Sequence, residues 1–121
     1  MTLCSLRRVY DPAQPGEGLR VLVDRLWPRG VTKDKVDLWL KEAAPSESLR
    51  RRFHGGGEDW AAFRLDYLAE LADPAGQAAL AKLKALCSEG PVTLLYAVRD
   101  EARNNAIVLR EGLDRYIADK A

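Results

Sequence analysis

Three short apolar runs, separated by polar and turn-forming segments, set the strand pattern of this chain. The candidate strands are residues 6–10, 19–24 and 91–98. The second and third are mostly continuous valine and leucine, which is typical of strands buried on both faces of a parallel sheet. Residues 11–18 contain two prolines and two glycines and therefore predict a loop between the first two strands.

Helical patterns fill most of the remaining chain. In residues 58–72 the apolar side chains of Trp60, Phe63, Tyr67 and Leu71 recur at helical spacing and predict an amphipathic helix. N-capping residues, a proline at a first turn and glycine stops predict further helices over 33–41 after Thr32, 47–53 after Ser46 and before Gly55, Gly56 and Gly57, 74–89 from Pro74, and about 103–117.

The order of these elements predicts the fold class. Strands that alternate with helices indicate an α/β fold with a mainly parallel sheet covered on both sides. The chain has 121 residues, 47% of them hydrophobic, which is enough for one real core. We therefore expect a single small domain over residues 1–121, with three or four strands covered by about five helices.

Charge and cysteine content narrow the environment of the protein. The formal net charge is +1, so there is no global attraction to nucleic acid, although the first half is slightly basic. No run approaches the roughly 20 apolar residues of a membrane helix, and the N-terminus lacks the apolar core of a signal peptide, so we expect a cytoplasmic protein off the membrane. Cys4 and Cys87 lack metal-binding spacing, and we expect free thiols, no metal and no cofactor.

The segment DRLWPRG at residues 24–30 carries the strongest candidate chemistry. It follows a predicted strand, and ligands of open α/β sheets bind outside the carboxyl ends of the strands. Arg25 and Arg29 could converge there on a carboxylate or phosphate, which the guanidinium fork fits. Equally, Asp24 could pair with one arginine and pin the loop. Trp27 could stack on a ligand, or it could anchor the loop.

The end of the third predicted strand offers a second group of candidate ligand-binding residues. Tyr96 lies in that strand, Arg99 and Asp100 follow it, and Asn104 and Asn105 begin the last helix. If the second and third strands are parallel neighbours, these residues meet the DRLWPRG loop at one sheet edge, where free helix N–H groups can bind an anion. The alternatives are that Asn104 only caps the helix, and that a cation such as Mg²⁺ offsets the nearby carboxylates.

Asp24 and His54 are the weak candidates for catalysis. His54 is the single histidine and could transfer a proton near neutral pH, although its place at a helix end before glycine equally indicates a capping role. The three successive arginines at 50–52 fan across roughly 200° of a helix. They predict a solvated basic face, with contact to a phosphate backbone as the alternative.

Several segments together carry a family resemblance. They are VDRLWPRG at 23–30, WLK at 39–41 with APS at 44–46, FH at 53–54, WAAF and YLAEL between 60 and 71, and LLYA at 94–97 followed by Asp100 and Asn104. In this combination the chain resembles the YeaO-like branch of the family DUF488, from about residue 6 to 114. The resemblance implies an α/β fold and no known activity. The wider family often has a cysteine and a Cys-His-Arg run at the positions of Tyr96 and 104–106, so thiol or metal chemistry is not expected here.

These observations predict a small-ligand protein that binds an anionic or phosphate-bearing metabolite in an arginine-rich pocket. One alternative is an enzyme of hydrolase or transferase type at the same pocket, with Asp24 or His54 moving a proton. Another is a nucleic-acid or protein partner on the basic first half, which the near-neutral net charge disfavours. The sequence has no P-loop, no dinucleotide-binding glycine motif and no serine nucleophile elbow, so no motif decides between them.

Overall fold

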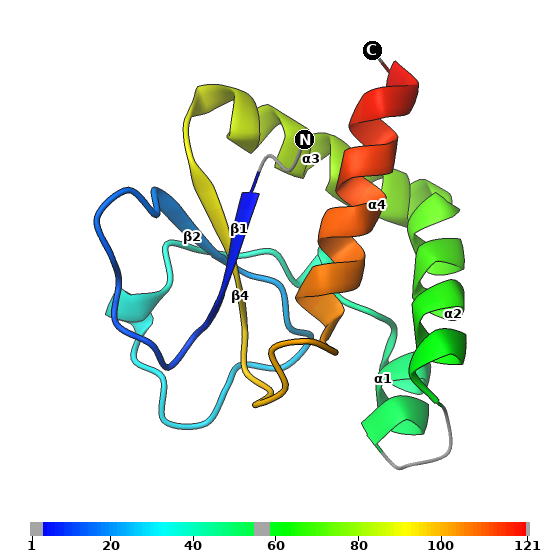
Figure 1. The fold of residues 1–121 in the computed structure, drawn as a ribbon, viewed down its shortest axis with the longest axis horizontal. Helices are drawn as coiled ribbons and strands as arrows, with labels where there is room; N and C mark the ends of the chain where they lie inside the picture. Colours follow the sequence, from blue (N-terminus) through cyan, green and yellow to red (C-terminus); the bar gives the residue numbers. More distant parts are fainter. Residues whose placement is uncertain (1–3, 55–58, 121) are drawn as a thin grey trace.

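A four-stranded parallel sheet forms the centre of the computed structural model, which describes residues 4–54 and 59–120 (Figure 1). The strand order is β1-β4-β2-β3, and each neighbouring pair is parallel. All carboxyl ends of the strands therefore lie along one edge of the sheet. The strands are β1 (Cys4–Arg8), β2 (Leu19–Leu22), β3 (Leu38–Trp39) and β4 (Val92–Tyr96).

The described residues contain four α-helices and two single-turn 3₁₀ helices, so the predicted α/β class is confirmed with slightly fewer helices than five. The α-helices are α1 (Glu47–His54), α2 (Trp60–Ala72), α3 (Pro74–Glu89) and α4 (Asn105–Lys120), and the 3₁₀ helices are η1 (Lys33–Lys35) and η2 (Lys41–Ala43). The capping role of Ser46 and the start of α3 at Pro74 are confirmed, since the amide of Leu49 donates to Ser46 Oγ over 3.1 Å.

The prediction of a helix over residues 33–41 is wrong. After the single turn η1 the chain straightens into β3, where Leu38 and Trp39 pair with Val21 and Leu22. Tertiary pairing thus overrides the local pattern, and it supplies the fourth strand of the sheet. Thr32 precedes η1 but makes no side-chain cap to its backbone. The expected glycine stop at residues 55–57 lies outside the described residues.

The two faces of the sheet are covered differently. Val21 and Leu94 point into the main core, which is built with residues of α1, α2, α3 and α4. Their neighbours Leu22 and Leu95 point to the opposite face, where they pack with Val31 and other residues of loops and β3. Helices on both faces were expected; here the loop after β2 covers the second face. The four helices therefore lie against one face of the sheet (Figure 1).

The helices and the two cysteines can be compared with what the composition predicts. No helix in the described part of the chain is long and apolar enough to cross a membrane. Cys4 and Cys87 are free thiols, and burial raises the pKa of Cys4 to about 12. Cys4 is therefore an unreactive thiol that packs in the core.

Candidate functional site

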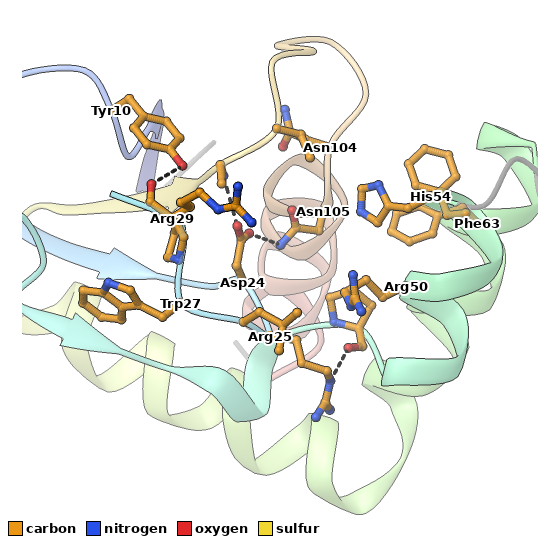
Figure 2. A pocket seen from close by; sticks show the side chains of 16 residues that line it. Tyr10, Asp24, Arg25, Trp27, Arg29, Arg50, His54, Phe63, Asn104 and Asn105 are labelled. Atoms are coloured by element: carbon orange, nitrogen blue, oxygen red, sulfur yellow. Dashed lines mark hydrogen bonds between the residues drawn. The ribbon is translucent and has the colours of Figure 1, made fainter. Parts of the chain in front are cut away.

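A cavity of about 220 Å³ opens at the carboxyl edge of the sheet (Figure 2). It lies between the loop after β2, the residues after β4, the first turn of α4 and the helix α1. The parallel sheet explains this position, because the chain leaves β2 and β4 at the same edge and each exit delivers polar residues there.

Asp24 and Asn105 form the floor of the cavity. The backbone amide of Ala97 donates to Asp24 Oδ2 over 3.1 Å, and Asn105 Nδ2 donates to Asp24 Oδ1 over 3.2 Å. The same Asn105 nitrogen also donates to the carbonyl of Val23 over 3.0 Å, so the floor ties the ends of β2 and β4 to the start of α4. Outside the cavity, Trp39 Nε1 donates to the carbonyl of Asp24 over 2.8 Å.

The environment of Asp24 changes its ionisation. Burial raises the pKa of Asp24 from 3.8 to about 6, and the hydrogen bonds from Asn105 and Ala97 oppose that rise. Both donors are neutral amides. Among the described residues no arginine pairs with this carboxylate, so Asp24 does not pin the loop through an ion pair. A carboxyl group with this pKa changes its charge close to neutral pH.

The two arginines of the DRLWPRG segment have different environments. Arg25 Nε donates to the carbonyl of Pro45 over 2.9 Å, which turns the guanidinium away from the floor (Figure 2). Arg29 is fixed through its backbone, whose carbonyl accepts from the Tyr10 hydroxyl over 2.9 Å. The Arg29 side chain extends toward the floor (Figure 2), and within the described residues its guanidinium has no hydrogen bond or ion pair. Arg29 is therefore the cation most available to a ligand.

The helix α1 supplies the opposite wall. Arg50 faces the cavity and pairs with Glu47 over 2.6 Å. Phe53 stacks on Phe63 of α2 with their ring centroids 4.4 Å apart, and His54 meets Phe53 edge-on at 5.5 Å. Burial and the charge of Arg50 lower the pKa of His54, so this imidazole is mostly neutral at pH 7.

The cavity brings together most of the residues predicted from sequence. Asp24, Arg25, Trp27, Arg29, His54, Asn104 and Asn105 all line it. Trp27 is also a loop anchor, since its Nε1 donates to the carbonyl of Val31 over 2.8 Å and its ring packs edge-on against Trp39. Asn104 caps α4, because its Oδ1 accepts from the amide of Ile107 over 3.1 Å. Trp27 and Asn104 therefore each support the fold and also line the cavity.

Three predicted residues do not line the cavity. Tyr96 is 3% exposed and belongs to the core under the helices, because the alternation along β4 places it on the same face of the sheet as Leu94. Asp100 closes a turn, with its Oδ1 accepting from the amides of Ala102 and Arg103. Arg99 is exposed beside that turn. Neither the tyrosine nor the polar turn is in position to contact a ligand in this cavity.

Nine lining residues were not predicted as site residues, and the aromatic and charged ones among them are Tyr10, Arg50, Phe53 and Phe63. The signal for the α1 residues was present, since positions 50, 53 and 54 share one helical face. Arg51, by contrast, is exposed and pairs with Glu47 outside the cavity. The three successive arginines thus fan around the helix as expected, and one of them reaches the pocket.

A family model covers nearly the whole chain. The model described as the inactive DUF488-N3 subclade matches residues 3–121. The chain belongs to the DUF488 family. Among its DUF488 relatives, the uncharacterized protein YeaO of Escherichia coli (strain K12) is 46% identical over 109 residues, which cover 88% of this chain and 93% of YeaO. The YeaO-like resemblance read from the sequence is thereby confirmed.

A second relative comes from Mycobacterium tuberculosis. The uncharacterized protein Rv3073c of Mycobacterium tuberculosis (strain ATCC 25618 / H37Rv) is 42% identical over 115 residues, covering 93% of this chain and 95% of the relative. No solved structure matches the chain significantly. The chemistry of this DUF488 member therefore has to be argued from its own cavity.

Proposed function

We propose that the protein binds a small anionic ligand, bearing a carboxylate or a phosphate, in the cavity at the carboxyl edge of the sheet. The observation that carries this proposal is the Arg29 guanidinium, which extends toward the floor without a partner among the described residues. Arg25 and Arg50 line the same cavity, and Asp24 is the one carboxylate among the described lining residues. The balance of charge therefore favours an anion.

The floor carboxylate is compatible with an anionic ligand. Because burial already raises the pKa of Asp24 to about 6, protonation of this group at neutral pH requires little free energy. An approaching anion raises that pKa further and can drive proton uptake. The repulsion that an ordinary ionised aspartate would exert is thus largely avoided.

We favour binding over turnover. The lining residues that the structure describes include no cysteine, serine or threonine that could serve as a nucleophile. Both oxygens of Asp24 already accept hydrogen bonds from amides of the fold. The matching family model carries the description "inactive", which agrees with a binding role.

One observation keeps an enzyme of hydrolase or transferase type as the second candidate. A carboxyl group with a pKa of about 6 is suited to general acid–base catalysis at neutral pH. Asp24→Asn separates the two functions: a binding protein keeps its ligand in this variant, whereas an enzyme that relies on the Asp24 proton loses turnover.

The test is a thermal-shift screen with phosphate, sulfate, acetate and mononucleotides. A ligand at about 100 times its dissociation constant stabilises the fold by about 2.7 kcal/mol, which raises the melting temperature by roughly 8–16 °C in a domain of this size. Arg29→Ala should abolish the rise. Arg99→Ala is the matched control, because this exposed arginine lies off the cavity.

A second matched pair lies on α1. Arg50 and Arg51 both pair with Glu47, but of the two only Arg50 lines the cavity. Arg50→Ala should weaken the response to the ligand, and Arg51→Ala should leave it unchanged. If no anion raises the melting temperature, or if Arg29→Ala responds like the unmodified protein, the proposal is wrong. A steep loss of oligonucleotide binding with salt would instead support a nucleic-acid partner.

A further inference from the structure

We propose that the ligand is a planar single-ring acid: an aromatic or heteroaromatic ring that carries one anionic group. This inference rests on the proposed function and names the class of its ligand. It follows from the unpaired Arg29 guanidinium on one side of the cavity, from the rings that α1 and α2 bring to the other side beside Arg50, and from the volume of the cavity.

The aromatic wall is built by α1 and the start of α2. Phe53 is half-buried and lines the cavity, and its ring is fixed by stacking on Phe63, with 4.4 Å between centroids and 25° between planes. Trp60 packs against the same ring at 5.9 Å from outside the cavity. His54 adds a second ring at the wall, edge-on to Phe53. A ring already held in place loses little conformational freedom when a ligand packs on it.

Arg29 faces this aromatic wall across the floor, and Arg50 stands on the same helix as Phe53. Figure 2 shows Arg29 entering from the side of Tyr10, His54 and Phe63 standing on the other side, and Asp24 with Asn105 between them. A ligand that contacts both sides therefore needs its charge at one end and an apolar, flat surface at the other. Phosphate or sulfate can meet the guanidinium of Arg29 or Arg50, but it leaves the rings of the α1 wall without a partner.

The volume limits the size of the ring system. A protein cavity of about 150 Å³ holds one benzene. The present cavity of about 220 Å³ holds one such ring and a carboxylate-sized group, and it is too small to enclose two fused rings with a sugar and a phosphate. One ring that carries one anionic group therefore matches the volume of the cavity.

The test compares three carboxylates of equal charge by NMR titration of ¹⁵N-labelled protein. The probes are benzoate, cyclohexanecarboxylate, which matches benzoate in size but is not planar, and acetate, which has no ring. Contact between aromatic rings favours binding by about 2- to 12-fold over an aliphatic group of similar area. We expect benzoate to bind more tightly than cyclohexanecarboxylate by that factor, and both to bind more tightly than acetate.

Two variants assign the effect to the aromatic wall. Phe53→Leu removes the ring that faces the cavity and should bring benzoate down to the affinity of cyclohexanecarboxylate. Trp60→Leu disturbs the same stack from outside the cavity and should leave the ratio of the two affinities unchanged. Amide spectra of both variants show whether the fold is retained, and affinities are compared only as ratios within one variant.

The outcomes separate this inference from the proposed function. If acetate or phosphate binds through Arg29 but benzoate and cyclohexanecarboxylate bind equally, the planar-ring inference is overturned and the anion site stands. Failure of all the anions overturns both. A preference for benzoate that persists in Phe53→Leu also overturns the inference, since the ring contact would then lie elsewhere.

Discussion

The ionisation of Asp24 yields a prediction that can be checked without knowing the ligand. Asp24→Asn keeps the shape of the side chain and removes its charge. In the variant the carboxamide oxygen can accept from only one of the two donors, Ala97 N or Asn105 Nδ2, and its NH₂ faces the other. That mismatch lowers the free energy of unfolding by about 1–3 kcal/mol at every pH.

The protonation of Asp24 adds a contribution to the free energy of unfolding that depends on pH. The pKa of Asp24 is 3.8 in an ordinary setting and about 6 in the fold, so the folded state holds the proton more tightly than the unfolded chain. The resulting stabilisation is complete below pH 3.8 and is lost as the pH rises through 6, for a total of about 3 kcal/mol. Of this total, about 1.3 kcal/mol is lost between pH 5 and pH 7.

The assay is urea denaturation of both proteins across that pH range. The quantity of interest is the free energy of unfolding of the unmodified protein minus that of Asp24→Asn, which should fall by about 1.3 kcal/mol from pH 5 to pH 7. Other titrating groups cancel in the difference unless they face Asp24. His54 is the neighbour that titrates nearby, so both measurements are repeated with His54→Gln in each protein.

A difference that stays flat from pH 5 to pH 7 would refute the reasoning. Asp24 would then ionise near its ordinary value, which requires that the cations of the cavity compensate for its burial. A difference that rises with pH would mean that Asp24 is paired in the fold with a cation such as Arg29. The inference that the floor carboxyl takes up a proton easily and so accepts an anion would then be wrong.

Three further predictions concern the same edge of the sheet and its supports. Sulfate should bind about fivefold more tightly at pH 5 than at pH 7.5, because the floor carboxylate takes up a proton, and calorimetry should find most of this gain missing in the asparagine variant. Tyr67→Phe should lower the free energy of unfolding in urea by about 1–3 kcal/mol, since its fully buried hydroxyl donates to a backbone carbonyl just before α1. Gly18→Ala should destabilise by about 1–3 kcal/mol more than Gly16→Ala in the same assay. Both glycines have positive φ, but only at Gly18 would a Cβ meet Pro91 O, at 2.1 Å, so equal losses would contradict that close approach.

The sequence predicted the parts of the fold that local pattern determines. The apolar runs of β2 and β4 are continuous because both faces of the sheet are buried, and this is what indicated a parallel sheet. β3 escaped prediction because it has two residues, Leu38 and Trp39, in a polar surrounding. Its strand conformation comes from pairing with β2, a tertiary contact that no local period encodes.

Some residues of the candidate site could be predicted from local sequence, and others depend on tertiary packing. Asp24 and Asn105 were expected at one sheet edge, and the structure joins them by a hydrogen bond. The sequence places positions 50, 53 and 54 on one helical face. The approach of that helix to the sheet edge depends on its packing against α2, which one sequence does not reveal. Tyr96 was expected at the site although alternation along β4 places it in the core. Which side chains of a strand lie under the helices depends on the elements that pack on each face of the sheet. One sequence does not reveal how those elements pack.

The strand order has a consequence for the way the protein is made. β4 is the last strand in the chain but lies between β1 and β2, so Cys4 finds its partner only at Val92. While a ribosome is still synthesising the segment before Pro91, β1 has no neighbour in the sheet and the floor of the cavity has neither Ala97 nor Asn105. We expect the nascent chain to form at most the short β2–β3 pairing until its final quarter emerges, and then to gain the four-stranded sheet and the cavity together.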